Sequence, residues 1–302
     1  YSGDNNTRRF NIGMKPDLVW IKCRNASAGH RLFDTVRGVR NSLLTSSEAN
    51  EDTDSQFGYV SAFHSDGFTL TPGTYSGYES GDVNMSGRTY VNWSWRAGGS
   101  GSTFNVDDVG YASASAAGLT SGSTNPTAAS VGTKQGFSII KYQGTGSSAT
   151  VAHGLSQVPE FQVIKNLTDD STDWRVYTTV VDGSMDYFFF NEIDAKGNSS
   201  ATPFTSTVFE LGTNNDQNGS GKNYISYLWH SVPGLQKFGS YIGNASATDG
   251  NFIELGFRPA LIWIKALYSY DGGNTQVSET GWAIYDSARS STNPNGDVLG
   301  IN

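Results

Sequence analysis

Three stretches decide the fold of this chain: PDLVWIK at Pro16–Lys22, PEFQVIK at Pro159–Lys165 and PALIWIK at Pro259–Lys265. Each follows a tyrosine and a glycine at a similar distance. These pairs are Tyr1 and Gly3, Tyr142 and Gly144, and Tyr241 and Gly243. Self-similarity at this spacing predicts one structural unit built three times. Residues shared by all copies are therefore expected to be scaffold.

Further blocks extend the similarity beyond this strand. SDGFTL at Ser65–Leu70 matches STVFEL at Ser206–Leu211, and YVNWSW at Tyr90–Trp95 matches YISYLW at Tyr224–Trp229. The third copy stops before both blocks. The first copy lacks the strand that precedes the tyrosine in the others, at Gly136–Lys141 and Leu235–Ser240. We therefore expect an excerpt of a longer protein, cut inside a repeat at each end.

The composition indicates short strands joined by many turns. The chain has 302 residues with 36 Gly, 13% aromatic residues and only 16% charged residues. Clusters of Asn, Asp, Ser and Gly, such as Asp66–Gly67 and Asp182–Gly183, are typical of turns between strands. The sequence predicts an all-β fold of tandem antiparallel β-sandwich, jelly-roll-like repeats of about 100 residues. The expected divisions are repeat 1 at 1–97, a connector at 98–135, repeat 2 at 136–234 and repeat 3 at 235–302.

The strands differ in how many of their faces are apolar. Tyr224–Trp229 places Ile225, Tyr227 and Trp229 on one face, which we expect to be core. Leu18–Ile21 and Leu261–Ile264 are apolar at every position, which predicts a cover on both faces. A sandwich covers one face by itself, so a neighbouring repeat or another subunit is favoured over a loop for the other.

The connector Gly98–Gln135 is rich in Gly, Ala, Ser and Thr, a composition typical of a flexible or extended linker. Phe104, Val106, Val109 and Tyr111 are unusual in a free linker. We therefore expect this connector to pack partly against a neighbour.

Charge and cysteine content exclude several classes of protein. A net charge of −8 and a pI near 4.9 argue against nucleic-acid binding, which needs clustered Lys and Arg. No apolar span is long enough to cross a membrane, so no membrane insertion is expected. The single cysteine, Cys23, forms no internal disulfide, and a half-buried apolar role is expected for it.

Catalytic signatures are not found. The four histidines lack the close spacing of a zinc site, and no Ser, His and Asp arrangement with a nucleophile elbow occurs. We therefore predict that the chain is not an enzyme and needs no cofactor, with no metal ligand assigned. Acidic runs occur in polar stretches, where solvated loops are the default: Asp107 and Asp108; Asp169, Asp170 and Asp173; Glu48, Glu51, Asp52 and Asp54. Calcium, which takes carboxylate and carbonyl oxygens, is the better alternative for such loops, although no EF-hand spacing occurs.

Tyrosines outside the repeated strands are the candidates for surface glycan contact, because sugars stack on exposed rings. Exposed or subunit-packing rings are the competing interpretation. The candidates are Tyr75, Tyr78, Tyr187, Tyr268 and Tyr270.

The connector carries the most specific resemblance. NVDDVGYASASAAG at Asn105–Gly118 and SVGTKQGFSIIKY at Ser130–Tyr142, with the SDGFTL and YVNWSW blocks, resemble a repeated module of marine tailed-phage (cyanophage-like) tail fibre and other virion appendage proteins. The resemblance implies a viral structural protein on the exterior of the virion that contacts other virion proteins and a host-surface glycan. It also implies a homo-oligomer, with a trimer as the common form. In the second copy Thr178 replaces the Asp34 and Asp286 of the others, which argues against a ligand role for that aspartate.

Two readings from other classes stay open. One is a carbohydrate-binding module of a secreted or cell-surface bacterial protein. The other is a polysaccharide-degrading enzyme, which needs two carboxylates about 5 to 10 Å apart.

Overall fold

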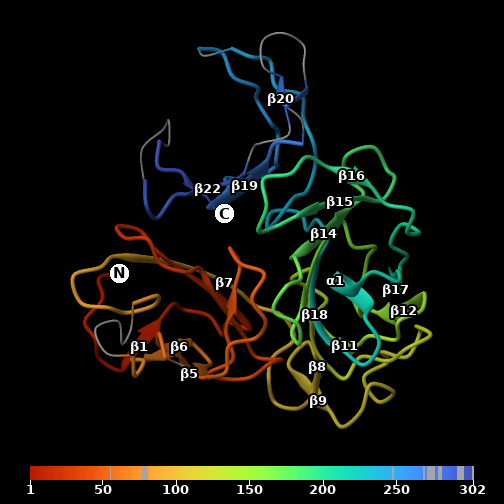
Figure 1. Cartoon of the computed structure of the whole chain (residues 1–302), viewed down its shortest axis with the longest axis horizontal. Helices are drawn as coiled ribbons and strands as arrows, with labels where there is room; N and C mark the ends of the chain where they lie inside the picture. Colours follow the sequence, from red (N-terminus) through yellow and green to blue (C-terminus); the bar gives the residue numbers. More distant parts are fainter. Residues whose placement is uncertain are drawn as a thin grey trace.

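The computed structural model describes residues 1–54, 56–75, 81–246, 248–267, 269–270, 276–277, 281–290 and 296–300. These residues form antiparallel sheets, with one parallel pairing and one short helix, α1 (Asn215–Asn218) (Figure 1). The predicted all-β fold with antiparallel sheets is thus confirmed. Among the described residues no helix is long and apolar enough to span a membrane.

The first sandwich consists of two sheets. One sheet has the order β4 (Leu43–Leu44), β3 (Arg31–Asp34), β2 (Leu18–Cys23), β7 (Tyr90–Trp95), and the other has the order β1 (Arg8–Asn11), β6 (Gly67–Thr71), β5 (Tyr59–His64). Val19 and Ile21 of β2 pack against Phe68 and Leu70 of β6 in the core between the sheets. Cys23 is fully buried in the same core, deeper than expected.

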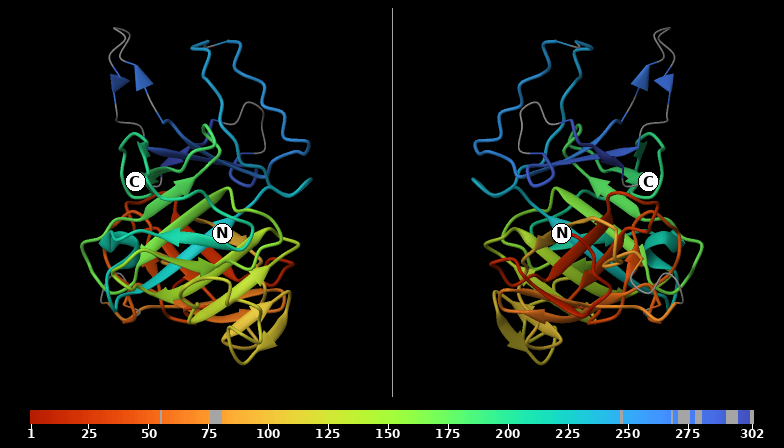
Figure 2. Two further views of the ribbon diagram at one scale, coloured as in Figure 1. Left: turned by 90° about the vertical axis from the view of Figure 1, so that its right-hand side faces the viewer. Right: turned by 90° about the vertical axis from the view of Figure 1, so that its left-hand side faces the viewer.

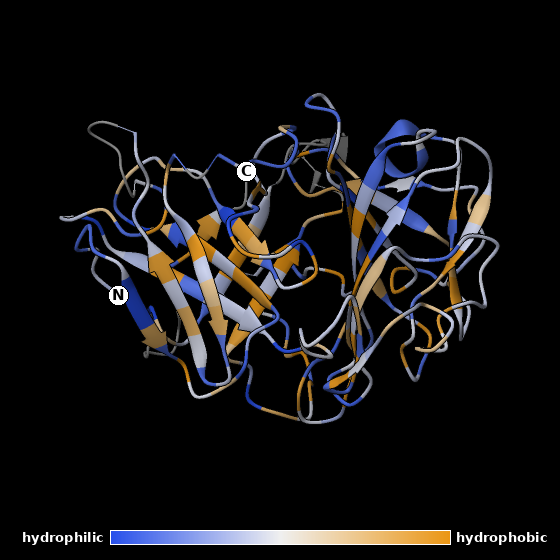
Figure 3. Ribbon diagram, turned by 90° about the horizontal axis from the view of Figure 1, so that it is seen from below, coloured by the Kyte–Doolittle hydropathy of each residue, from blue (hydrophilic) through white to orange (hydrophobic). Residues whose placement is uncertain are grey.

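The second sandwich pairs a large sheet with a small one. The large sheet has the order β16 (Gly197–Asn198), β15 (Asp186–Phe189), β14 (Arg175–Thr178), β13 (Phe161–Asn166), β18 (Asn223–Trp229), β11 (Phe137–Gln143), β10 (Ala128–Gly132), β8 (Phe104–Val106), β9 (Val109–Tyr111), and the small one contains β12 (Ala149–Ala152) and β17 (Val208–Leu211). Ile140, Ile164 and Leu228 of the large sheet face Val151 and Phe209 of the small one. Figure 3 shows apolar residues concentrated on the strands of both sandwiches.

Residues 98–135, expected as a connector, supply strands β8, β9 and β10 to the large sheet. Phe104 is buried, Val106 and Tyr111 are partly buried against the same core, and Val109 is exposed. Their packing explains why apolar side chains occur in a stretch otherwise composed of small residues.

The third sheet is smaller. It has the order β19 (Leu261–Lys265), β22 (Trp282–Asp286), β23 (Leu299–Gly300), and a separate pair is formed by β20 (Ser269–Tyr270) and β21 (Gln276–Val277). Both lie on the same side of the two sandwiches as the extended segment that follows β18 (Figure 2). The strand expected at Leu235–Ser240 is not formed, and only an isolated bridge joins Gln236 to Val232. Its counterpart β11 lies between β10 and β18, whereas no strand of the described residues pairs with 235–240.

A central aromatic core joins the two sandwiches and the third sheet. It contains Trp20 of β2, Phe190 after β15, Trp229 of β18, and Trp263 and Trp282 of the third sheet. The Trp20 ring lies 5.5 Å from the Trp263 ring and 5.6 Å from the Phe190 ring. Ile225 and Tyr227, predicted to be core with Trp229, also pack here. Apolar side chains from both sandwiches and the third sheet are therefore buried together.

The doubly apolar strands have different outcomes. In β2 the prediction of two covered faces is confirmed, since Val19 is 0% exposed on one face and Trp20 contacts other sheets on the opposite face. In β19 the same prediction is wrong, because Ile262 is 39% exposed. Trp263 reaches the central core, but no second layer of the described residues covers the Ile262 face.

Candidate functional site

A buried aspartate connects the second sandwich to the first. Asp34, at the end of β3, accepts hydrogen bonds from the backbone of Val36 and Arg37 and from Arg37 Nε at 2.5 Å. Tyr227 donates its hydroxyl to Asp34 Oδ2 at 2.7 Å. Burial alone would lower the pKa of the Arg37 guanidinium, but Asp34, Tyr227 and Glu51 together outweigh it and raise that pKa. The charge is thus fully compensated inside the protein.

The same arrangement connects the first sandwich to the third sheet. Asp286, at the end of β22, accepts from the backbone of Ala288 and Arg289 and from Arg289 Nε at 2.6 Å. Trp93 of the first sandwich donates its indole N–H to Asp286 Oδ2 at 3.2 Å. Burial would raise the pKa of Asp286, but the hydrogen bonds from Arg289 outweigh it and lower that pKa. Both aspartates are therefore structural, which agrees with the argument against a ligand role.

Three lysines at the ends of the repeated strands each hold a loop. Lys22 donates to the carbonyl of Ala28, Lys165 to the carbonyl of Glu48 at 2.7 Å, and Lys265 to the carbonyl of Glu192 at 3.2 Å. Lys165 thus connects the second sandwich to the first, and Lys265 connects the third sheet to the second sandwich. Burial lowers the pKa of both Lys165 and Lys265 to about 8.

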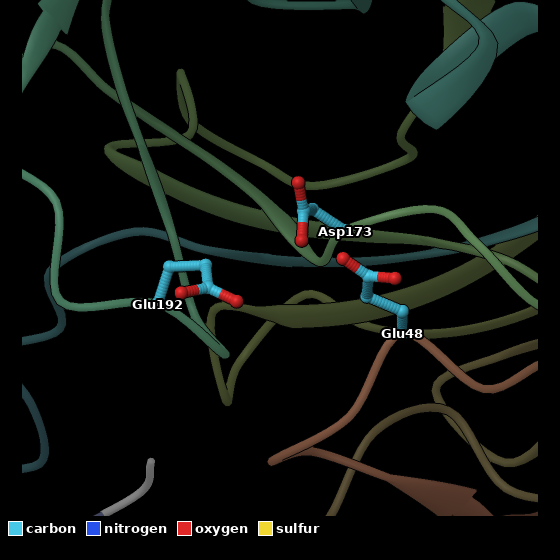
Figure 4. Close-up of side chains that lie close together, drawn as sticks. All are labelled: Glu48, Asp173 and Glu192. Atoms are coloured by element: carbon cyan, nitrogen blue, oxygen red, sulfur yellow. The ribbon is translucent and has the colours of Figure 1, made fainter.

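The two loops held in this way bring three carboxylates together. Glu48 follows β4, Asp173 precedes β14 and Glu192 follows β15, and their nearest carboxylate oxygens all lie within 4.8 Å of one another. Figure 4 shows the three side chains converging from separate loops. Asn191 Nδ2 donates to Asp173 at 2.8 Å and to Glu192 at 3.3 Å. We call this group the carboxylate trio.

Glu48 and Glu192 of the trio line an open hollow of about 540 Å³ between the two sandwiches. The lining consists of small and polar residues: Ser46, Ser47, Glu48, Ala49, Asp170, Asn191 and Glu192. Burial, and then the Asp173 carboxylate, raise the pKa of Glu192. Such a surface offers oxygen atoms of the kind that Ca²⁺ accepts, but its lining presents no ring on which a sugar could stack.

The sequence identified two members of the trio among its acidic runs. Glu192 was missed, because only the fold brings its loop to the other two, and no spacing in the sequence signals this. Most of the remaining acidic candidates have protein partners: Glu51 pairs with Arg37, Asp52 with Arg31, Asp108 with Arg96 and Lys15, and Asp169 with Lys222, while Asp107 accepts from Thr133 and Asp54 from Gln56. Asp170 lines the hollow.

The structure separates the tyrosine candidates. Tyr75 in the first sandwich is 47% exposed, with its ring 5.4 Å from that of Phe57. Tyr187 in the second sandwich is half-buried, and the Arg175 guanidinium lies 4.6 Å from its ring centre. Tyr78 and Tyr268 lie outside the described residues, as does the side chain of Tyr270.

These features define an all-β protein in which several sheets share one aromatic core and buried polar contacts. Residues 1–301 match a family described as a domain of unknown function, DUF7483, and the chain belongs to this family. No curated protein and no solved structure matches the chain.

Proposed function

We propose that this chain is a structural part of a phage tail fibre or other virion appendage that mediates contact with the host surface. The observation that supports it best is the shared core: sheets from both sandwiches and the third sheet bury tryptophans together, and Asp34 and Asp286 hold them by buried hydrogen bonds. A core shared in this way opposes separation of the sheets, which an appendage under mechanical load requires.

Host contact in this proposal uses the loops rather than the repeated strands. Strand side chains such as Trp20 and Tyr227 are buried in the core, whereas Tyr75 and the hollow beside Glu48 are accessible to solvent. Weak contacts on several copies of an appendage would add through effective concentration. The proposed partners are therefore other virion proteins, further copies of this chain and a host-surface glycan.

The test is to locate the protein on particles of the phage that encodes it. Antibodies against the isolated chain should label a tail or fibre in electron micrographs and should reduce adsorption to host cells. Absence of the protein from purified particles would contradict the virion assignment. Labelling without any effect on adsorption would support the structural role and contradict the proposed contact with the host.

A polysaccharide-degrading enzyme is the second candidate, because the trio gathers carboxylate oxygens within 4.8 Å of one another, slightly closer than the roughly 5–5.5 Å between the carboxyl groups of a retaining glycosidase, and because the pKa of Glu192 is raised. Release of reducing ends from host envelope polysaccharide, lost in Glu192→Gln, would support it. The absence of release by the unmodified protein would remove it. The lining of the hollow, which is small and polar, makes this candidate the weaker one.

A further inference from the structure

The three sheets around the central aromatic core are built on one register. In each of them the first residue of the repeated strand lies opposite the last residue of the neighbouring strand. The pairs are Leu18 and Asp34, Phe161 and Thr178, and Leu261 and Asp286. Figure 1 shows the first sandwich, the second sandwich and the third sheet, which we call the three units, around this core. The units therefore present equivalent strands to the core.

Indole hydrogen bonds join the units in succession. Trp174 of the second unit donates to the carbonyl of Leu44 in the first at 2.9 Å, and Trp282 of the third unit donates to the carbonyl of Phe189 in the second at 3.0 Å. The two acceptors are equivalent, because Leu44 and Phe189 each lie opposite the first residue of β3 or β14. The same contact thus occurs twice, each time from one unit to the unit before it.

The lysines of the repeated strands follow the same direction. Lys165 of the second unit holds the Glu48 carbonyl of the first, and Lys265 of the third unit holds the Glu192 carbonyl of the second. Both carbonyls lie in the loop that follows the Leu44 or Phe189 position. The second junction is therefore a repetition of the first.

Backbone contacts repeat at these junctions as well. The N–H of Glu51 in the first unit donates to the Leu167 carbonyl of the second at 3.4 Å. The N–H of Lys196 in the second unit donates to the Leu267 carbonyl of the third, also at 3.4 Å. The two junctions thus share one arrangement of the backbone.

A third junction leads from the first unit back to the third. Trp93 and Tyr227 lie at the same register position beside the repeated strand. Tyr227 of the second unit donates to Asp34 of the first, and Trp93 of the first unit donates to Asp286 of the third. The first unit therefore contacts the third in the way that the second contacts the first.

These contacts are heterologous, because the donor face of one unit meets a different, acceptor face of the next. Heterologous contacts give a ring when the rotation between units closes and an open filament when it does not. The rings of Trp20 and Trp95 in the first unit lie 5.5 and 5.6 Å from the ring of Trp263 in the third. Three units of one chain therefore complete the ring.

The junctions differ in chemistry at one equivalent position. Asp34 accepts from a phenol hydroxyl and Asp286 from an indole N–H, whereas the Thr178 hydroxyl donates to the carbonyl of Glu160 in its own unit. A ring of three identical chains has the same chemistry at all of its junctions. The differences indicate that each junction is matched to one pair of units within one chain.

We propose that one chain takes the place of a cyclic homotrimer, because its three units supply the threefold arrangement and recognise one another through these junctions. Asp34 and Asp286 are 0% and 4% exposed, so a further copy cannot reach them without displacing a unit. The resemblance described above implies three copies around one axis, and the closed ring provides that arrangement with one copy. Further copies of the chain and other proteins therefore contact the outside or the ends of the ring. This inference does not depend on the proposed function.

The first experiment measures the molar mass of the full chain by light scattering after size-exclusion chromatography. We expect a monomer of 32.4 kDa. The midpoint of thermal unfolding should stay the same over about a hundredfold range of protein concentration, because contacts within one chain do not depend on mass action. A molar mass of three chains, or a midpoint that rises with concentration, would overturn the proposal.

The second experiment tests the junction that closes the ring. Trp93→Phe and Asp286→Asn remove the same hydrogen bond, so the double variant should lose less in unfolding midpoint than the sum of the two single losses. Tyr142→Phe is the matched control, since it removes a buried aromatic donor within the second unit, to the carbonyl of Gln217, and its effect should add to that of Asp286→Asn. Circular dichroism before heating establishes that each variant is folded. Additive losses for Trp93→Phe and Asp286→Asn would show that the first and third units do not close a ring in solution.

Discussion

Strands β2 and β19 have almost the same sequence, LVWIK and LIWIK, but different surroundings. In β2 both faces are buried, one by β6 and the other by the central aromatic core. In β19 only the core-facing side is covered, and Ile262 is exposed. An apolar strand thus specifies the need for a cover, while other segments decide whether the cover is present.

The largest expected effect tests this comparison directly. Val19→Asp should prevent folding of the first sandwich, because an isolated carboxylate in an apolar core costs far more than the typical stability of about 5–15 kcal/mol allows. Ile262→Asp, at the equivalent position of β19, should change the free energy of unfolding by about 0.5 kcal/mol or less. Denaturant unfolding followed by circular dichroism measures both. Similar losses in the two variants would mean that the outer face of β19 is covered in solution.

Much of this comparison could be predicted from the sequence. The period-two pattern of Ile225, Tyr227 and Trp229 predicted one buried face of β18 correctly, although the opposite face, with Leu228, is also buried. The turn clusters predicted the fold class. The shared core was only partly predictable, because the apolar run Leu18–Ile21 indicates a second cover without identifying it. The trio was not predictable as a group, since Glu192 reaches Glu48 only through the packing of two sandwiches.

The next effect concerns the buried aspartates. Asp34→Ala removes the partner of the Tyr227 hydroxyl and leaves the buried Arg37 guanidinium with Glu51, at 3.2 Å, as its remaining ion-pair partner among the described residues. A loss of about 3–5 kcal/mol in the free energy of unfolding is expected. Thr178→Ala at the equivalent place of the second sandwich removes two neutral hydrogen bonds, one to the Glu160 carbonyl and one from the Val180 backbone N–H, and should cost about 1–2 kcal/mol. Chemical denaturation of both variants gives the comparison. Equal losses of unfolding free energy in the two variants would contradict a larger structural role for the Asp34 carboxylate than for the Thr178 hydroxyl.

A double substitution sharpens that prediction. Asp34→Asn with Tyr227→Phe should cost less than the sum of the two single changes, because both remove the same hydrogen bond. Strict additivity, measured by a double-mutant cycle, would indicate that the two sandwiches do not rely on this contact.

The lysines give a pH dependence. The pKa of Lys165 is about 8 in the folded protein, and that of an unburied lysine is 10.5. The unfolded chain therefore binds more protons between these values, and stability should rise as the pH increases from about 8 to about 10, by roughly 1–3 kcal/mol. The raised pKa of buried tyrosines such as Tyr227 opposes this rise at higher pH. Lys165→Met should reduce this rise in the free energy of unfolding, measured by denaturation at a series of pH values. If the rise is unchanged in the variant, groups other than Lys165 cause it.

The smallest effect concerns the carboxylate trio, which differs from the buried aspartates in having no arginine partner among the described residues. Burial, and then the neighbouring carboxylates, raise the pKa of Glu192, so its folded form binds more protons than the unfolded chain, and stability should fall as the pH rises through the carboxyl range. Glu192→Gln should remove this slope and raise stability at neutral pH by a few tenths of a kcal/mol, since exposed charges are screened. Thermal unfolding in the presence of a chelator measures it, with Glu254→Gln on the exposed segment as the control. A destabilised Glu192→Gln protein would show that the carboxylate makes a favourable contact that outweighs the repulsion within the trio.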